Sequence, residues 1–188
     1  MTWVFGYGSL MWRPGFSHDQ REAALLRGYH RRYCLISTRG RGTPETPGMM
    51  LGLLPGGTCT GVAYRVTPGR ETEVLAYLDE RENEGSSNRR VLFPVRILSG
   101  GGAALESAWA FLPMVSGENY VGAIAANTCV RNIAAGVGKR GTALEYLRSM
   151  LAEVTALGAE EPGMEALLRE VERVAGDRGG APAAARGR

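Results

Sequence analysis

The stretch Trp3-Val4-Phe5-Gly6-Tyr7-Gly8-Ser9-Leu10 decides how the rest of the chain is interpreted. Its first three residues are two β-favouring residues and a tryptophan that end at glycine, which predicts a short strand. Because Gly6 and Gly8 lack Cβ, the backbone there can take positive φ and lie against a ligand, with amide N–H groups pointing outward beside the Ser9 hydroxyl. The stretch therefore predicts either an anion cradle or a strand that ends in a tight turn. Neither longer glycine-rich nucleotide motif follows it, so a nucleotide site is disfavoured.

The composition is that of one ordinary globular domain. A chain of 188 residues is long enough to bury roughly two-thirds of its unfolded surface. The net charge of +3 comes from 22 basic and 19 acidic residues, and several arginines lie near residue 188, so we expect no nucleic-acid partner. No window approaches about 18 uninterrupted apolar residues, and no basic segment precedes an apolar run at the N-terminus. We therefore expect a cytoplasmic protein without a membrane span.

The cysteines indicate neither a disulfide framework nor a metal site. Cys34, Cys59 and Cys129 are odd in number and far apart, and His18 and His30 are the other soft ligands of the chain. We expect buried thiols in a reducing compartment and no bound metal.

The middle of the chain predicts about six short strands, counting the first one. Residues 30–37 favour a strand, whereas 21–28 are too mixed to assign, and the Gly- and Pro-rich segment 39–48 predicts an ordered or a mobile loop. The runs 49–54 and 61–66 predict an antiparallel hairpin across Pro55-Gly56-Gly57. A second hairpin is predicted for two further runs separated by a glycine triplet, residues 91–98 and 107–112.

One helix is predicted to carry an acidic residue toward the core. It runs from about Arg70 to Glu82, and its apolar stripe, continued by one turn beyond Leu78, reaches Glu82. A charge on the core side of a helix end costs several kcal/mol unless it is paired or protonated. The alternative is that the helix ends earlier and leaves Glu82 solvated.

The last third of the chain predicts three helices, of which the first two pack on the sheet. Their apolar residues span 124–133, 144–154 and 164–174. Residues 176–188 contain mainly glycine, proline, alanine and arginine, which predicts disorder. We therefore expect a single domain over residues 1–175, a disordered tail over 176–188, and a monomer.

Several short motifs, in this order, resemble those of the ChaC family of γ-glutamylcyclotransferases. The resemblance covers roughly residues 3–150. The motifs are Trp-Val-Phe-Gly-Tyr-Gly-Ser-Leu-Met-Trp at 3–12, Arg-Gly-Thr-Pro-Glu-Thr-Pro-Gly at 41–48, Gly-Val-Ala-Tyr-Arg-Val at 61–66, Tyr-Leu-Asp-Glu-Arg-Glu at 77–82, Asn-Tyr-Val-Gly at 119–122 and Glu-Tyr-Leu at 145–147.

The resemblance implies an α+β fold, a small mixed β-barrel with surrounding helices. It implies that glutathione is the substrate, cut into 5-oxoproline and cysteinylglycine without a metal or cofactor. Glu82 matches the acid/base of the family, and Tyr120 matches the tyrosine of its Tyr-(Ile/Leu/Val)-Gly segment. The loop that holds the γ-glutamyl group matches Tyr7, Gly8, Ser9 and Leu10.

Two departures from the family pattern leave the substrate range open. The segment after Glu82, residues 83–89, lacks the usual tyrosine, and residues 136–142 look longer than the usual turn. The alternatives are a cyclotransferase that acts on other γ-glutamyl amino acids or amines, and a non-catalytic, ligand-binding regulatory protein of the same fold.

The chemistry of ring closure fits these residue types. The substrate's own α-amine attacks its γ-carbonyl, and since an α-ammonium has a pKa of about 8, a base must remove a proton first. A half-buried Glu82 with a raised pKa could do so and later return the proton to the departing amine. Amide N–H groups of residues 6–10 could stabilise the oxyanion.

Other candidate residues keep two interpretations each. Ser9 has no histidine at a triad-like spacing, so we expect it to donate or accept hydrogen bonds rather than attack. Tyr120 is either a packed aromatic residue or a ligand contact. Arg39 and Arg41 either meet the glycine carboxylate of the substrate or lie solvated in a loop.

Overall fold

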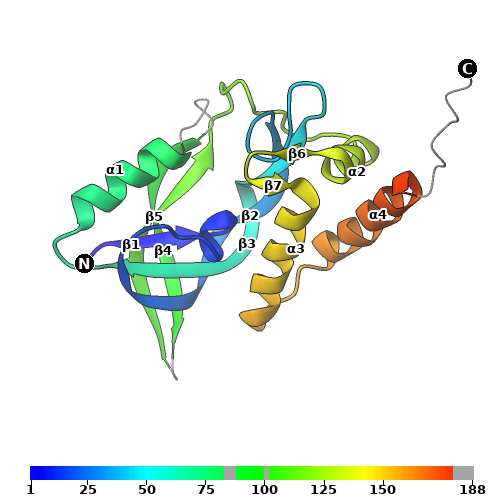
Figure 1. The fold of residues 1–188 in the computed structure, drawn as a ribbon. Helices are drawn as coiled ribbons and strands as arrows, with labels where there is room; N and C mark the ends of the chain where they lie inside the picture. Colours follow the sequence, from blue (N-terminus) through cyan, green and yellow to red (C-terminus); the bar gives the residue numbers. More distant parts are fainter. Residues whose placement is uncertain (83–87, 100–101, 180–188) are drawn as a thin grey trace, which may run out of the picture.

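The fold is a closed β-barrel flanked by helices. The computed structural model describes residues 1–82, 88–99 and 102–179 (Figure 1). Five strands close in the order β1-β3-β2-β4-β5, because β1 pairs antiparallel with β3 and parallel with β5. The barrel strands are β1 (Trp3–Gly6), β2 (His18–Ser37), β3 (Gly48–Val66), β4 (Asn88–Ser99) and β5 (Gly102–Pro113). The expected α+β barrel is confirmed, with a separate two-stranded hairpin of β6 (Val137–Gly138) and β7 (Gly141–Thr142) beside it.

The first predicted hairpin was wrong, because its two runs belong to one strand. β3 passes through the glycine pair Gly56 (φ 98°) and Gly57 (φ 73°), and it pairs with β2 on both sides of that point. On β2, Gly28 (φ 82°) stands opposite, at a shift in register between Arg27 and Tyr29. Glycine thus allows both long strands to bend together at a bulge rather than reversing one of them. Residues 21–28, which the pattern left unassigned, form the first half of β2.

The second predicted hairpin is confirmed. β4 and β5 pair antiparallel from Asn88↔Pro113 to Ser99↔Gly102. The glycine turn between them falls partly on residues 100–101, which lie outside the described residues.

β1 joins the two apolar clusters of the protein. Val4 packs with Val74 and Leu78 of the helix α1 (Glu71–Glu82), while Phe5 belongs to the larger cluster inside the barrel. Both β1 side chains are fully buried. Successive residues of a strand point to opposite faces, so this alternation pins β1 between the two clusters. The loop that follows β1 therefore starts from a rigid support.

The remaining helices come from the last third of the chain. They are α2 (Ala126–Ala135), α3 (Ala143–Ala156) and α4 (Pro162–Gly179), and Figure 1 shows α4 on the outer side of α3. α2 and α3 each contact β3, as predicted. α4 continues to Gly179, past the boundary expected at residue 175, since Ala175 and Arg178 are compatible with a helix. Residues 180–188 of the predicted tail lie outside the described residues.

The three cysteines are free and buried. Burial raises the pKa of the Cys34 and Cys129 thiols to about 11. Such thiols are protonated at neutral pH and are poor nucleophiles. Among the described residues, no helix combines the length and apolar content needed to cross a bilayer.

The start of α3 offers a test of local stability. The Thr142 side chain accepts a hydrogen bond from the Glu145 N–H (3.0 Å), and the Glu145 carboxylate accepts one from the Thr142 N–H (2.9 Å). We expect Thr142→Ala to lower the free energy of unfolding by about 1 kcal/mol, because one donor of the first turn loses its acceptor. Urea unfolding measures this change. Thr155→Ala, at an exposed position near the end of the same helix, is the control and should change stability by less than about half as much.

Candidate active site

A cavity of about 170 Å³ opens where the loop after β1 meets the end of α1. Its walls also come from the end of β2, from residues 38–40, from residues 118–119 and from α3. The lining includes all four residues of the sequence-predicted loop and the predicted acid/base: Tyr7, Gly8, Ser9, Leu10 and Glu82. The fold thus brings together two sequence motifs that lie about 70 residues apart.

The glycines of the loop serve a different purpose from the one expected. Neither Gly6 nor Gly8 has positive φ, and Gly8 has φ −129°. A Cβ on Gly6 would lie 2.8 Å from the Leu10 Cβ, and one on Gly8 would lie 2.6 Å from the Tyr146 hydroxyl oxygen. Glycine is therefore needed here for close packing rather than for a left-handed backbone.

Tyr146 of α3 is the residue against which Gly8 packs. Its ring is buried, contacts Trp12 edge-on and lies beneath the Arg41 guanidinium, whose carbon is 5.3 Å from the ring centroid. Burial, with a further contribution from the Glu82 charge, raises the pKa of Tyr146 to about 12. The neutral phenol forms one wall of the cavity and fixes how close the loop can come to α3.

The loop lines the cavity, and the fold does not use all of its backbone N–H groups. The short 3-10 helix η1 (Ser9–Met11) uses the N–H groups of Met11 and Arg13, which donate to the carbonyls of Gly8 and Ser9. In the described parts of the chain, no hydrogen bond uses the N–H groups of Gly8, Ser9 or Leu10. Unpaired amides beside a cavity are available to a negatively charged oxygen.

Tyr7 anchors the loop to the barrel. Its hydroxyl donates to the Phe111 carbonyl at 2.7 Å, and its own carbonyl accepts from Arg31 Nη1 at 3.0 Å. Arg31 is buried and also donates to the Thr60 carbonyl. Burial, and then the nearby Glu82 charge, raise the pKa of Tyr7 well above its usual value. Tyr7 is therefore a neutral residue of the cavity wall, and two hydrogen bonds fix its position.

Glu82 is the last residue of α1, and its side chain is 21% exposed. Burial raises the pKa of this carboxyl above its usual value, while the cations of Arg81 and Arg140 act in the opposite direction. The prediction that Glu82 faces inward is thus supported over the solvated alternative. A carboxylate with a raised pKa is a stronger base than an ordinary glutamate.

Arg81 connects Glu82 to the loop. Its Nε lies 3.2 Å from Glu82 Oε1, and its Nη2 donates to Ser9 Oγ at 3.2 Å. Its Nη1 donates to the carbonyls of Arg13 and Pro14 at 2.7 and 2.8 Å. One guanidinium therefore fixes the carboxylate, the serine and the start of the next segment relative to one another.

Tyr120 lies beside the cavity rather than in its wall. Its backbone forms a bridge with Leu35, and its ring lies against Gly122, where an added Cβ would be 3.5 Å from the nearest ring atom. The residues before it, Glu118 and Asn119, do line the cavity. The Asn119 carbonyl accepts from the Ile36 N–H, so this segment is held by backbone pairing to β2.

Sequence reasoning missed several cavity residues. Arg140 lies between β6 and β7, in the segment 136–142 that looked too long, and its basic turn Gly138-Lys139-Arg140-Gly141 was the available signal. The Lys139 and Arg140 N–H groups donate to the carbonyls of Arg39 and Gly40, which orders the loop between β2 and β3. Arg81 stood within a quoted motif but had no assigned role.

No group of three or more His, Cys, Asp or Glu side chains that could hold a metal ion occurs in the described part of the chain. The described residues that line the cavity include two carboxyls, those of Glu82 and Glu118, two buried phenols, arginines and the backbone of the β1 loop.

Known proteins resemble this chain in sequence and in fold. The family described as ChaC-like protein matches residues 2–174. A glutathione-specific γ-glutamylcyclotransferase of Escherichia coli is 34% identical over 173 residues, which are 92% of this chain and 74% of the relative. A γ-glutamylcyclotransferase 2-1 of Arabidopsis thaliana is also 34% identical, over 92% of this chain and 83% of the relative.

The fold has a solved counterpart as well. A crystal structure of a γ-glutamylcyclotransferase specific to glutathione from yeast superposes with a TM-score of 0.84 at 23% identity, covering 92% of this chain and 96% of the yeast chain. On the extent of the family match and the identity to its members, this chain belongs to the ChaC-like family.

Proposed function

We propose that the protein is a glutathione-degrading γ-glutamylcyclotransferase in which Glu82 is the acid/base. The observation that carries this proposal is one cavity lined both by the partly buried carboxyl of Glu82, whose pKa is raised, and by Gly8, Ser9 and Leu10, whose N–H groups have no hydrogen bond among the described residues. The names of the relatives supply the substrate. A ligand-binding protein would have no need of a titratable carboxyl at this place.

In the proposed reaction, the loop of residues 7–10 and the buried ring of Tyr7 hold the γ-glutamyl group folded back on itself. Glu82 removes a proton from the α-ammonium, the amine attacks the γ-carbonyl, and the new C–N bond closes the ring. The carbonyl oxygen becomes negative and is stabilised by the loop amides. Glu82 then returns the proton to the cysteinyl nitrogen as the original amide bond breaks. The ring nitrogen loses its second proton to the departing amine, which leaves as the ammonium, giving 5-oxoproline and cysteinylglycine.

The scheme uses only the substrate's amine and groups of the protein, and so includes no metal or cofactor. We assign Ser9 to a hydrogen-bonding role, because its Oγ already accepts from Arg81. Tyr120 contributes by holding Glu118 and Asn119 against the end of β2. We also propose that the protein acts as a monomer in the cytoplasm.

Incubation with glutathione and with γ-glutamyl dipeptides, side by side, tests the proposal by following 5-oxoproline. We expect release from glutathione in the absence of added metal. Release of 5-oxoproline from γ-glutamyl dipeptides alone would show a cyclotransferase that acts on other γ-glutamyl compounds. Tight binding of glutathione without release of 5-oxoproline would favour a regulatory protein.

The pH dependence of the reaction tests the environment of Glu82. Because the base must be deprotonated and its pKa is raised, kcat/KM should fall as pH drops through a value above the ordinary glutamate pKa of about 4.3. Arg81→Gln removes a cation that favours the charged carboxylate, so the acidic limb should move to higher pH. Arg70→Gln, at the exposed residue just before α1, is the control and should leave the limb in place. An unshifted limb in the Arg81 variant would contradict the assigned contact.

A further inference from the structure

A second cavity opens directly outside the first one. The two share part of their lining, including Ser9, Arg81, Arg140 and Tyr146. The outer cavity adds Arg13, from the segment after η1, and Arg41, from the loop between β2 and β3. A ligand held in the inner cavity can therefore extend into the outer one without crossing a wall.

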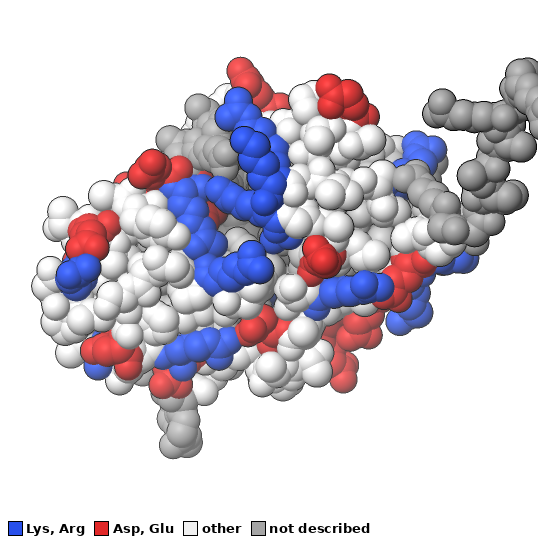
Figure 2. All heavy atoms as spheres, viewed as in Figure 1, with Lys and Arg blue, Asp and Glu red and all other residues white. Residues whose placement is uncertain are grey.

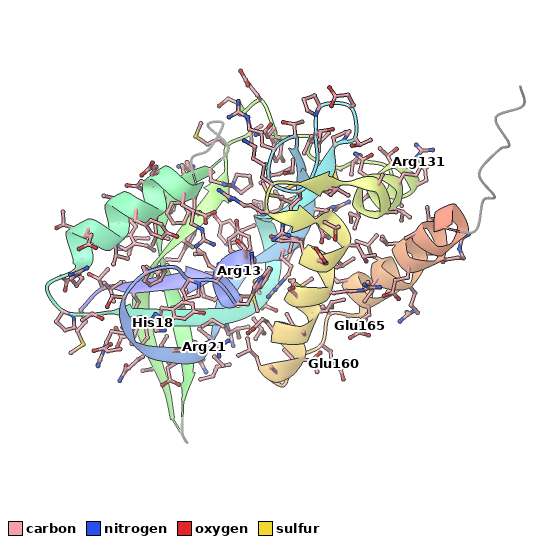
Figure 3. All side chains as sticks on the ribbon, viewed as in Figure 1. Arg13, His18, Arg21, Arg131, Glu160 and Glu165 are labelled. Carbon is pink, nitrogen blue, oxygen red and sulfur yellow. The ribbon has the colours of Figure 1, made fainter. Side chains whose placement is uncertain are left out.

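The outer cavity is strongly cationic. Of the described residues that line it, four are arginines, Arg13, Arg41, Arg81 and Arg140, and one is acidic, Glu80. Figure 2 shows Lys and Arg side chains bordering a hollow in the middle of this face, and Figure 3 places Arg13 at the centre of the same view. Arg81 is paired with Glu82, and Arg140 also has an interaction within the protein, so Arg13 and Arg41 are the cations available to a ligand.

Arg13, Arg41 and Arg140 come from separate segments of the chain and line the same cavity. Burial and then the charges of Arg13 and Arg140 lower the pKa of Arg41, while Tyr146 and Glu145 act in the opposite direction. The Glu145 carboxylate accepts from the Thr142 N–H. Arg41 itself is 7% exposed and donates to the Thr142 carbonyl at 3.3 Å, which holds its side chain over the Tyr146 ring. Like charges brought together at a partly desolvated place repel one another, and an anion between them relieves the repulsion.

We propose that the arginine cluster of Arg13 and Arg41, with Arg140 beside it, is a carboxylate subsite that binds the free C-terminal carboxylate of the peptide leaving group. The inference rests on the proposed function, because the inner cavity must hold the γ-glutamyl end for the other end of the substrate to reach the cluster. Arginine suits the task, since its planar fork of donors matches the geometry of a carboxylate. The subsite selects γ-glutamyl peptides with a terminal carboxylate over γ-glutamylamines.

Two substrates and three proteins test the subsite. The substrates are glutathione and glutathione amidated at the glycine carboxyl; the proteins are the wild type, Arg13→Gln and the double variant Arg13→Gln/Arg41→Gln. We expect the wild type to prefer glutathione over the amide by about tenfold to a hundredfold in kcat/KM, with the difference in KM, because charge-assisted hydrogen bonds are lost with the charge. The double variant should lose that preference, because its kcat/KM falls more for glutathione than for the amide. Arg13→Gln, whose side chain is exposed, should lose part of the preference.

The matched control is Arg131→Gln, which removes an exposed arginine from α2, well apart from Arg13 in Figure 3. It should keep the wild-type preference. Equal use of both substrates by the wild type, or an equal loss on both substrates in the arginine variants, would overturn the subsite.

Calorimetric titration of both peptides into Glu82→Gln gives a readout that does not depend on turnover. Glutathione should bind more tightly than its amide by a similar factor, and equal affinities would overturn the subsite. If the wild type releases no 5-oxoproline but the two peptides still differ in affinity, the proposed reaction is contradicted and the subsite is supported.

Discussion

Glu82→Gln is expected to lower kcat for 5-oxoproline release by about a thousandfold while leaving the affinity for glutathione within a few-fold of the wild type. The amide side chain keeps the shape of the carboxyl and cannot take up the proton of the α-ammonium. Ground-state binding should persist, because the inner cavity retains the loop amides and the Tyr7 wall. Steady-state assays give kcat, and calorimetry with the same variant gives the affinity.

The control for this variant is Glu73→Gln, which neutralises an exposed glutamate on the same helix. It should keep wild-type turnover. We expect the thermal midpoint of Glu82→Gln to lie within a few degrees of the wild type, since Arg81 keeps its bonds to Ser9 and to the carbonyls of Arg13 and Pro14. Normal turnover by a folded Glu82→Gln protein would assign the acid/base to another group.

The position of Glu82 could be predicted because it depends on local geometry. An apolar stripe of period 3.6 residues runs through Val74 and Leu78, and its continuation fixes the direction in which residue 82 points. The structure buries Val74 and Leu78 and ends α1 at Glu82, as the pattern predicted. The Glu82 side chain faces the loop after β1. That this loop lies close to Glu82 could be predicted only from the family resemblance.

Features that depend on contacts between distant segments could not be predicted in the same way. The glycines at 28, 56 and 57 resemble turn signals along the chain, and only the pairing of β2 with β3 shows that they bend two strands together. Arg13, Arg41 and Arg140 are scattered arginines in the sequence and become one cluster through the packing of three loops. Tyr120 matched a family motif, yet a motif does not specify whether the ring or the backbone of a residue serves the site.

The packing of Gly8 against Tyr146 has the second large expected effect. Gly8→Ala would place a Cβ 2.6 Å from the Tyr146 hydroxyl oxygen, well inside van der Waals contact. Tyr146 cannot easily yield, because its ring is buried and packs edge-on with Trp12. The loop must shift instead and carry its amides away from the substrate carbonyl. We expect kcat/KM to fall about a hundredfold, whereas Gly163→Ala, where an added Cβ meets open space, should have no effect.

A second substitution separates this clash from any other consequence of adding a methyl group. Tyr146→Phe removes the hydroxyl oxygen, and the next atom of the ring, Cζ, is 3.7 Å from the new Cβ, an ordinary contact distance. Gly8→Ala should therefore cost much less activity in the Tyr146→Phe background than in the wild type. Such non-additivity is the signature of two groups that act on each other directly. If the two losses simply add, the hydroxyl does not limit the approach of the loop, and the need for glycine at position 8 must come from the ligand itself.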